Sequence, residues 1–131
     1  YMDLLSLAEM QDPDIDVILN LAEDLPLKHQ ESLYLKLEDG VAWDESLVFQ
    51  GLNFLLEKYY DNKALLIACG AGISRSVTFA AILLKAVERL KLSEALKEIK
   101  SGYPKALPNP IVWRSVCEIF GAKFNATDLI Y

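Results

Sequence analysis

The stretch that decides the fold is "ALLIACGAGISRSVTFAAILLKAVERL", residues 64–90. It opens with a short and wholly apolar run, 64–68, which is typical of a strand that is buried on both faces of a sheet. A loop of small residues follows, and then an apolar-periodic run that is long enough for about five helical turns. This order predicts a strand, a tight loop and a helix, with Cys69 at the carboxyl end of the strand and Arg75 at the start of the helix.

The remaining chain alternates between strand-like and helix-like patterns, which indicates an α/β fold with a central, mostly parallel sheet flanked by helices. Apolar and β-branched stretches predict strands over residues 14–21 and 33–39. Apolar residues at helical spacing predict helices over 2–10, 43–62, 93–102 and 111–121. The chain shows no internal repeat and no second domain, so we expect one domain over residues 1–131.

Composition and charge disfavour several classes of function. The net charge is −6, which disfavours binding to nucleic acid or to an anionic membrane surface, and no apolar segment approaches membrane-spanning length. One histidine and two separated cysteines give no zinc-type spacing, so we expect no metal and no cofactor. Two cysteines are too few for a disulfide framework, and no secretory signal pattern opens the chain, so we expect a reducing, cytoplasmic location. Cys117 lies in a helical pattern and is expected to be a buried apolar residue.

The loop after Cys69 has the chemistry of an anion site. In open α/β sheets, ligands bind outside the carboxyl ends of the strands, and small residues let successive backbone N–H groups curl inward as a nest. The dipole of the following helix acts at the same place. Arg75 offers two parallel donors to a tetrahedral oxyanion, and the same positive field favours the nucleophilic thiolate of Cys69. With the hydroxyl of Ser76 within reach, the pattern fits attack by sulfur on a bound phosphoryl group.

The motif "ACGAGISRS", residues 68–76, resembles the signature loop of the cysteine-based protein phosphatases, usually written His-Cys-x5-Arg-Ser/Thr. Its "AGxSRS" form resembles the dual-specificity phosphatases. The likeness extends over residues 2–121, through the first helix and strand, the segment 33–69 and the Pro-Asn segment "YPKALPNPIVWRSVCEIF". The family's usual opening strand is not found in this chain, so we expect the domain to lack its N-terminal strand.

The resemblance implies a role for each motif residue. Cys69 would be the nucleophile, and Ser76 would stabilise its thiolate as it leaves the phospho-cysteine intermediate. Asp39 would protonate the leaving oxygen and then deprotonate the attacking water. Asn109 would brace the loop by hydrogen bonding. The phosphate would be held by the loop residues Gly70, Ala71, Gly72, Ile73, Ser74 and Arg75.

Two of these assignments leave alternatives open. Asp39 precedes Gly40 and could be an ordinary turn residue, in which case Glu38 or Asp44 would be the acid. Asn109 lies between two prolines and could serve only to shape the turn.

The chain departs from the family pattern at Ala68, where the family has histidine. That histidine helps to orient the loop and to favour the thiolate, so the substitution weakens the prediction of catalysis without removing it. The leading hypothesis is a metal-independent, monomeric dual-specificity-type phosphatase that acts on phosphotyrosine, phosphoserine or phosphothreonine in proteins. The alternatives are a weak or inactive pseudophosphatase that binds phosphoproteins, and a rhodanese-like sulfur transferase. The Ser-Arg-Ser ending and the Pro-Asn segment disfavour the transferase.

Overall fold

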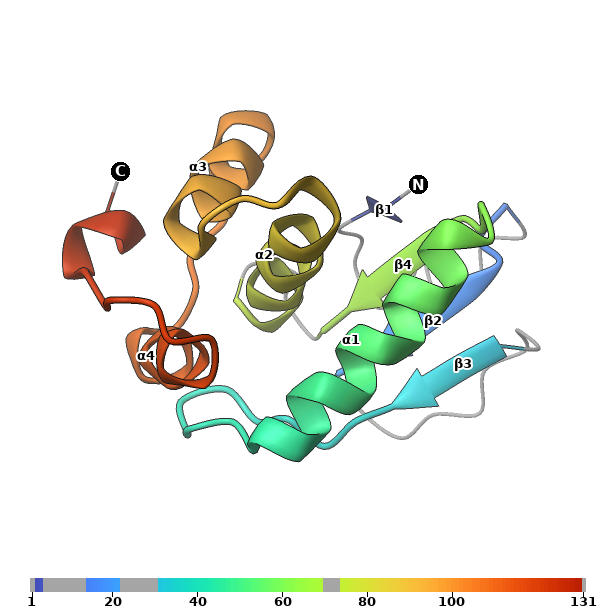
Figure 1. Ribbon diagram of the computed structural model, residues 1–131, viewed down its shortest axis with the longest axis horizontal. Coiled ribbons are helices and arrows are strands. Elements are labelled where there is room, and N and C mark those ends of the chain that lie inside the picture. Colours follow the sequence, from blue (N-terminus) through green and yellow to red (C-terminus); the bar gives the residue numbers. More distant parts are fainter. Residues whose placement is uncertain (1, 4–13, 22–30, 70–73, 131) are drawn as a thin grey trace.

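Within the residues that the structure describes, four parallel strands form one sheet with helices packed beside it (Figure 1). The computed structural model describes residues 2–3, 14–21, 31–69 and 74–130. The strands are β1 (Met2–Asp3), β2 (Val17–Asn20), β3 (Glu31–Tyr34) and β4 (Leu65–Ala68), in the sheet order β1-β4-β2-β3. The helices are α1 (Glu45–Tyr60), α2 (Arg75–Glu88), α3 (Leu92–Gly102) and α4 (Pro110–Ile119), followed by a 3-10 helix at Ala126–Leu129. The predicted α/β class is confirmed.

The beginning of the chain differs from the prediction. The spacing of apolar residues predicts a helix from Met2, but Met2 and Asp3 pair in parallel with Leu65 and Leu66. Hydrogen bonding to the edge of a buried strand therefore outweighs a helical pattern at these two residues. The remainder of the predicted helix, 4–10, lies outside the described residues.

The second predicted strand is displaced along the chain. The alternating pattern predicts a strand over 33–39, whereas β3 ends at Tyr34, which pairs with Asn20, the last residue of its partner β2. Leu35 and Leu37 nevertheless stay buried in the main core. The alternation thus reports correctly which side chains face inward, and it overstates how far the hydrogen-bonded ladder extends.

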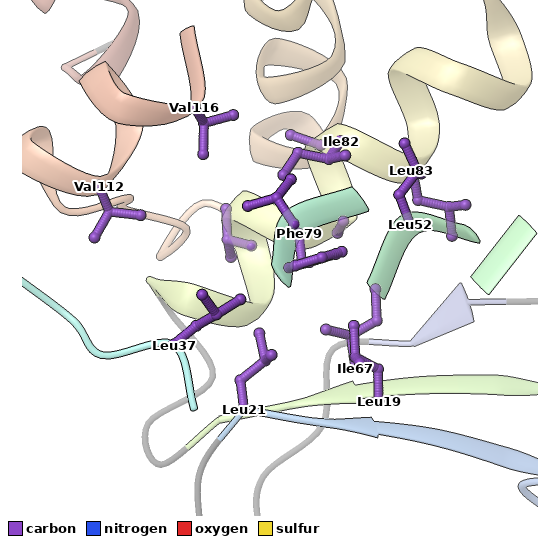
Figure 2. Close-up of a cluster of buried hydrophobic side chains, with 14 of the residues drawn as sticks. Leu19, Leu21, Leu37, Leu52, Ile67, Phe79, Ile82, Leu83, Val112 and Val116 are labelled. Carbon is purple, nitrogen blue, oxygen red and sulfur yellow. The ribbon is translucent and has the colours of Figure 1, made fainter. Parts of the chain in front are cut away.

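Strand β4 is buried on both faces, as its apolar run predicts. Leu65, Ile67 and Cys69 belong to the main core between the sheet and the helices. Leu66 and Ala68 face the other way and form a second, smaller cluster with residues of β2 and its approach. Figure 2 shows the main core, in which Leu19 of β2, Leu21 just after it and Ile67 of β4 meet residues of the helices, including Leu52, Phe79, Ile82, Leu83, Val112 and Val116.

Side-chain caps determine where two of the helices begin. Asp44 Oδ1 accepts backbone N–H bonds from the first turn of α1 at 2.8 and 3.3 Å. Asn109 Oδ1 caps α4 in the same way, at 2.9 and 3.4 Å, and Pro110 occupies the first helical position, where an N–H is not needed. Across the ranges that the structure describes, no helix is both long enough and apolar enough to cross a bilayer.

Gly51 allows α1 to pack closely against α2. A Cβ added at Gly51 would lie 2.6 Å from Cζ of Phe79 and 2.8 Å from Cδ1 of Leu35. The ring of Phe79 is fully buried, and it also lies 5.8 Å from the ring of Trp43, measured between centroids. Because Gly51 has no side chain, the ring of Phe79 can lie close both to α1 and to Trp43, which precedes α1.

We predict that Gly51→Ala lowers the free energy of unfolding by about 1–3 kcal/mol, because the added methyl group overpacks the contact with Phe79. The opposite sign is expected from helix propensity alone, which favours alanine over glycine by about 1 kcal/mol. Gly102→Ala is the matched control, since nothing lies within 4 Å of its added Cβ. Urea unfolding of both variants measures the difference. Equal stability of the two would contradict the close approach of the helices.

Candidate active site

Cys69 follows β4 directly, and its sulfur lies against the first turn of α2. The side chain is 2% exposed. The backbone N–H of Ser76 donates to Sγ at 3.4 Å, and the thiol donates to Ser76 Oγ at 3.3 Å. Because the Ser76 N–H belongs to the N-terminal turn of a helix, its bond would stabilise a negative charge on the sulfur. The structure thus brings together two of the residues that the motif predicts as partners.

Arg75 is the first residue of α2, and its guanidinium reaches the carboxyl ends of two neighbouring strands. Nη1 donates to the carbonyl oxygen of Leu21, just after β2, at 2.6 Å and to that of Leu37 at 3.4 Å. Both bonds use one nitrogen of a group that carries five N–H donors, so they orient the guanidinium without using its other donors. Among the described residues, no carboxylate forms an ion pair with Arg75.

A serine hydroxyl connects Asp39 to the start of α2. Ser74 Oγ donates to Asp39 Oδ1 at 2.7 Å and accepts the backbone N–H of Asn109 at 3.0 Å. Ser74 is the N-cap residue of α2, yet its side chain makes no capping bond, because the hydroxyl is used in these two links instead. The hydroxyl therefore joins segments that are 35 residues away from it in each direction along the chain.

Asn109 joins the site through its backbone, while its side-chain oxygen caps α4. Gly40, next to Asp39, has a positive φ of 82°, which favours glycine. A Cβ at Gly40 would lie 3.9 Å from Nδ2 of Asn109. The turn that carries Asp39 therefore packs directly against the Pro-Asn segment, and the turn-shaping and bracing roles considered for Asn109 are compatible.

A cavity of about 400 Å³ opens where these segments meet, a size typical of small-molecule sites. It is lined by Asp39, Cys69, Ser74, Arg75, Leu107, Pro108, Asn109, Pro110 and Leu129. Leu129 comes from the 3-10 helix, which the sequence patterns do not predict. The predicted phosphate-binding residues Gly70, Ala71, Gly72 and Ile73 lie outside the described residues.

Of the three acids considered from the sequence, only Asp39 lines this cavity. The Asp44 carboxylate caps α1 and also accepts the hydroxyl of Ser46 at 2.6 Å. The hydroxyl bond, followed by the backbone bonds of the cap, lowers the pKa of Asp44, which makes this group a poor proton donor near neutral pH. Glu38 is exposed and contributes its backbone carbonyl to the indole of Trp43. The geometry therefore favours Asp39 over the other two.

Two residues that the motif does not contain hold the Glu38–Trp43 loop in place. The indole N–H of Trp43 donates to the carbonyl oxygen of Glu38 at 2.9 Å and closes the loop. The backbone N–H of Trp43 donates to Ser115 Oγ at 3.0 Å, and this hydroxyl donates to the carbonyl oxygen of Val112 at 2.7 Å within α4. Trp43 and Ser115 are 72 residues apart, so no local sequence pattern indicates that they are partners.

Ala68 lies on the face of the sheet opposite to Cys69. Its side chain is fully buried with Ile15, Ile18 and Leu66, and its carbonyl oxygen accepts the backbone N–H of Leu21 at 2.8 Å. Ala68 is therefore not among the described residues that line the cavity.

The second cysteine, Cys117, lies in surroundings that disfavour a reactive thiolate. Cys117 is 2% exposed in α4, and burial raises the pKa of its thiol to about 11, with the charges of Asp128 and Glu118 acting in the same direction. It is therefore neutral at neutral pH, in agreement with its predicted role as a buried apolar residue.

A buried thiol at the end of a central parallel strand, followed by a helix that starts with arginine, defines the class of cysteine-dependent phosphatase-like domains. The family description "Dual specificity phosphatase, catalytic domain" matches residues 1–121. The chain belongs to the dual specificity phosphatase family.

Individual relatives agree with this placement. The dual specificity protein phosphatase Mpk3 of Drosophila melanogaster is 30% identical over 102 residues, which cover 73% of this chain and 25% of that protein. The tyrosine-protein phosphatase yvh1 of Schizosaccharomyces pombe is 31% identical over 123 residues, which cover 91% of this chain and 37% of that protein. The chain thus spans about a quarter to two fifths of the length of these relatives.

Solved structures show the same fold. Human DUSP28 superimposes with a TM-score of 0.80 at 20% sequence identity, over 90% of each chain. DUSP15 superimposes with a TM-score of 0.76 at 24% identity, over 97% of this chain and 85% of that chain.

We predict that Ser115→Ala lowers the free energy of unfolding by about 1–3 kcal/mol, because the backbone N–H of Trp43 loses its acceptor in a buried position. Ser101→Ala is the matched control. Ser101 makes the same type of hydroxyl bond to the carbonyl three residues earlier, at an exposed position and with no second partner among the described residues. Its loss should change stability by no more than about 0.5 kcal/mol. Equal effects of the two variants, measured by chemical unfolding, would show that the Trp43 contact contributes nothing.

We predict that Cys117 resists alkylation at neutral pH. A pKa of about 11 leaves only about one thiol in ten thousand ionised at pH 7, and the thiolate is the reactive form. Because the pKa is raised, reactivity should increase with pH until the pH approaches that value. Iodoacetamide labelling followed by peptide mass spectrometry of the Cys69→Ser variant isolates this residue. Rapid labelling of Cys117 in the folded protein at pH 7 would contradict the assignment.

Proposed function

We propose that this domain hydrolyses phosphomonoesters through a covalent phospho-cysteine intermediate. The observation that carries the proposal is the position of the Cys69 sulfur, which accepts a backbone N–H at the start of α2 in the same cavity as Arg75 and Asp39. Nucleophile, anion-binding cation and proton donor thus converge from three parts of the chain. Membership of the dual specificity phosphatase family supports the same chemistry.

In the first step of the proposed reaction, the Cys69 thiolate attacks the phosphorus of the bound phosphate. A sulfur–phosphorus bond forms, and the phosphorus–oxygen ester bond breaks. The proton on the Asp39 carboxyl passes to the leaving oxygen, so the alcohol departs neutral. Arg75 and the backbone amides of residues 70–75 stabilise the charge on the transferring phosphoryl group, and the reaction needs no metal ion.

In the second step, water attacks the phosphorus of the phospho-cysteine. Asp39, now ionised, accepts a proton from this water, and the sulfur–phosphorus bond breaks to release inorganic phosphate. The departing thiolate is stabilised by the hydroxyl of Ser76, which lies 3.3 Å from Sγ and donates to the sulfur in this state. Ser74 keeps the Asp39 carboxylate oriented toward the cavity through its hydroxyl bond.

The proposed substrates are proteins that carry phosphotyrosine, phosphoserine or phosphothreonine. Two relatives, a dual specificity protein phosphatase and a tyrosine-protein phosphatase, support this substrate class. Both cysteines are buried, and two cysteines are too few for a disulfide framework, which supports a reducing cytoplasmic compartment. A monomer is assumed.

A second candidate is a binding module that captures phosphoproteins with little or no turnover. It is favoured by Ala68, because the histidine that the family places there is missing. The position of Asp39 in the cavity supports the enzyme instead, since a module that only binds phosphate does not need a proton donor.

Hydrolysis of para-nitrophenyl phosphate in the presence of EDTA tests the proposal, measured from about pH 4 to about pH 9. We expect turnover that disappears in Cys69→Ser. In Asp39→Asn we expect kcat to fall roughly a hundredfold, with loss of the alkaline limb of the pH profile, because the proton donor is gone.

Asp44→Asn is the matched control for the acid. It removes a carboxylate from the same region while asparagine keeps the cap of α1, so kcat should stay within about twofold. A folded protein that binds vanadate but shows no turnover would overturn the enzyme and favour the binding module. Equal losses in Asp39→Asn and Asp44→Asn would remove Asp39 from its proposed role.

A further inference from the structure

A second cavity, of about 460 Å³, lies at the opposite end of α2 from the Cys69 site. Its walls come from the end of α2, the start of α3, α4 and the segment that follows α4. The ten residues from Arg75 to Lys85 correspond to about 15 Å along the helix axis, so the two cavities are separate. The second cavity is lined by Lys85, Arg89, Leu90, Lys91, Leu92, Ser93, Trp113, Cys117, Phe120, Gly121, Ala122, Lys123 and Asp128, and we refer to it as the basic cavity.

The basic cavity is positively charged in an acidic protein. Four cationic side chains and one carboxylate line it, which gives a formal charge of +3 (4 − 1), whereas the whole chain carries −6. The ion pairs formed among the described residues involve Lys58 and none of these four cations. Lys85 lies over the ring of Phe120, with Nζ 5.4 Å from the centroid. Asp128 is the one carboxylate in the lining, and among the described residues no carboxylate lies within ion-pair distance of these four cations.

A helix dipole favours the positions of two of the four cations, but it does not explain the positions of the other two. Lys85 and Arg89 lie at the C-terminal end of α2, where a cation is favoured. Lys91 is the N-cap residue of α3, where a cation is disfavoured and an anion is favoured. Lys123 lies beyond the end of α4. Glu94 Oε1 accepts the backbone N–H of Lys91 at 2.9 Å, so a carboxylate already interacts with the dipole at this end of α3. The contribution of Lys91 to anion binding would therefore come from its side-chain charge.

An unpaired donor at the same cavity is an independent indication of a ligand. Trp113 lines the basic cavity and is fully buried. Its indole Nε1 has no hydrogen-bond partner among the described residues. Buried indole N–H groups usually have an acceptor, because an unmade bond costs the full desolvation of the donor. An oxygen of a bound anion would supply that acceptor once the side chains covering Nε1 shift.

The remaining walls are apolar. Leu90, Leu92, Phe120 and Ala122 line the cavity with the neutral thiol of Cys117. A bare inorganic ion would leave this surface without contacts, whereas a ligand with an apolar body would fill it. The cavity is also of a size that accommodates a small organic molecule.

We propose that the basic cavity binds a small organic anion, with a carboxylate or phosphate group held by the four cations and an apolar body against the leucine and aromatic side chains. The indole N–H of Trp113 donates to the bound oxyanion. This site is independent of the reaction proposed at Cys69, and its test does not require catalysis.

The test uses 2-naphthoate as the probe and the indole N–H signals of the ¹⁵N-labelled protein as the readout. The chain has two tryptophans, so Trp43→Phe assigns the two signals. We expect 2-naphthoate to shift the Trp113 signal in a saturable manner, in the direction of a stronger hydrogen bond, while the Trp43 signal stays in place. Neutral 2-naphthol should shift it much less, and so should sulfate, which lacks the apolar body.

A pair of double variants matched in charge tests the role of the cations. Lys91→Gln with Lys123→Gln should weaken 2-naphthoate binding about tenfold, because two nearby charges are lost. Lys36→Gln with Lys63→Gln also changes the net charge from −6 to −8 but lies outside the cavity, so binding should be unchanged.

Three outcomes would overturn the proposal. The first is the absence of a saturable shift of the Trp113 signal at millimolar 2-naphthoate in the folded protein. The second is equal weakening in both double variants, which would show a general charge effect. The third is a shift of the Trp43 signal alone, with competitive inhibition of any hydrolysis, which would place the probe at the Cys69 site.

Discussion

The burial of β4 is the constraint on which the site depends. This strand pairs with β1 on one side and β2 on the other, and its residues are buried on both faces. A strand held in this way ends at a defined point, so Cys69 has little freedom of position. The N-terminal turn of α2 meets the sulfur at that point. The geometry of the thiol is thus a consequence of sheet packing, and the helix terminus supplies the electrostatic environment.

The proposed proton donor, Asp39, is positioned by a different set of interactions. Asp39 lies in a turn between an extended segment and α1, outside any strand or helix. Its position depends on the hydroxyl of Ser74, on the left-handed backbone of Gly40 and on the Trp43 bonds to Glu38 and Ser115. The interactions join α2, α4 and the turn, so the acid is correctly placed only when the helical layer has packed.

Helix α2 carries cationic residues at both of its ends. Its first residue, Arg75, donates to backbone carbonyls that follow β2 and β3 and lines the Cys69 cavity. Its last turn contributes Lys85 and its C-cap contributes Arg89 to the basic cavity. The helix between them is almost wholly buried in its first two turns. A largely buried helix with cations at both ends thus contributes to both of the anion sites that we propose for this acidic protein.

The sequence alone determined the α/β class, the order of β4, loop and α2, and the pairing of Cys69 with Ser76, because each of these follows from local periodicity or from residues within one motif. It also narrowed the candidates for the proposed general acid to three residues. Only the tertiary structure shows that Asp39, and neither of its alternatives, lines the Cys69 cavity, that Trp43 bonds to Ser115, and where the basic cavity lies, since each joins residues far apart in the chain. The extent of β3 and the pairing of Met2 are also features of the tertiary structure, because both depend on a neighbouring strand.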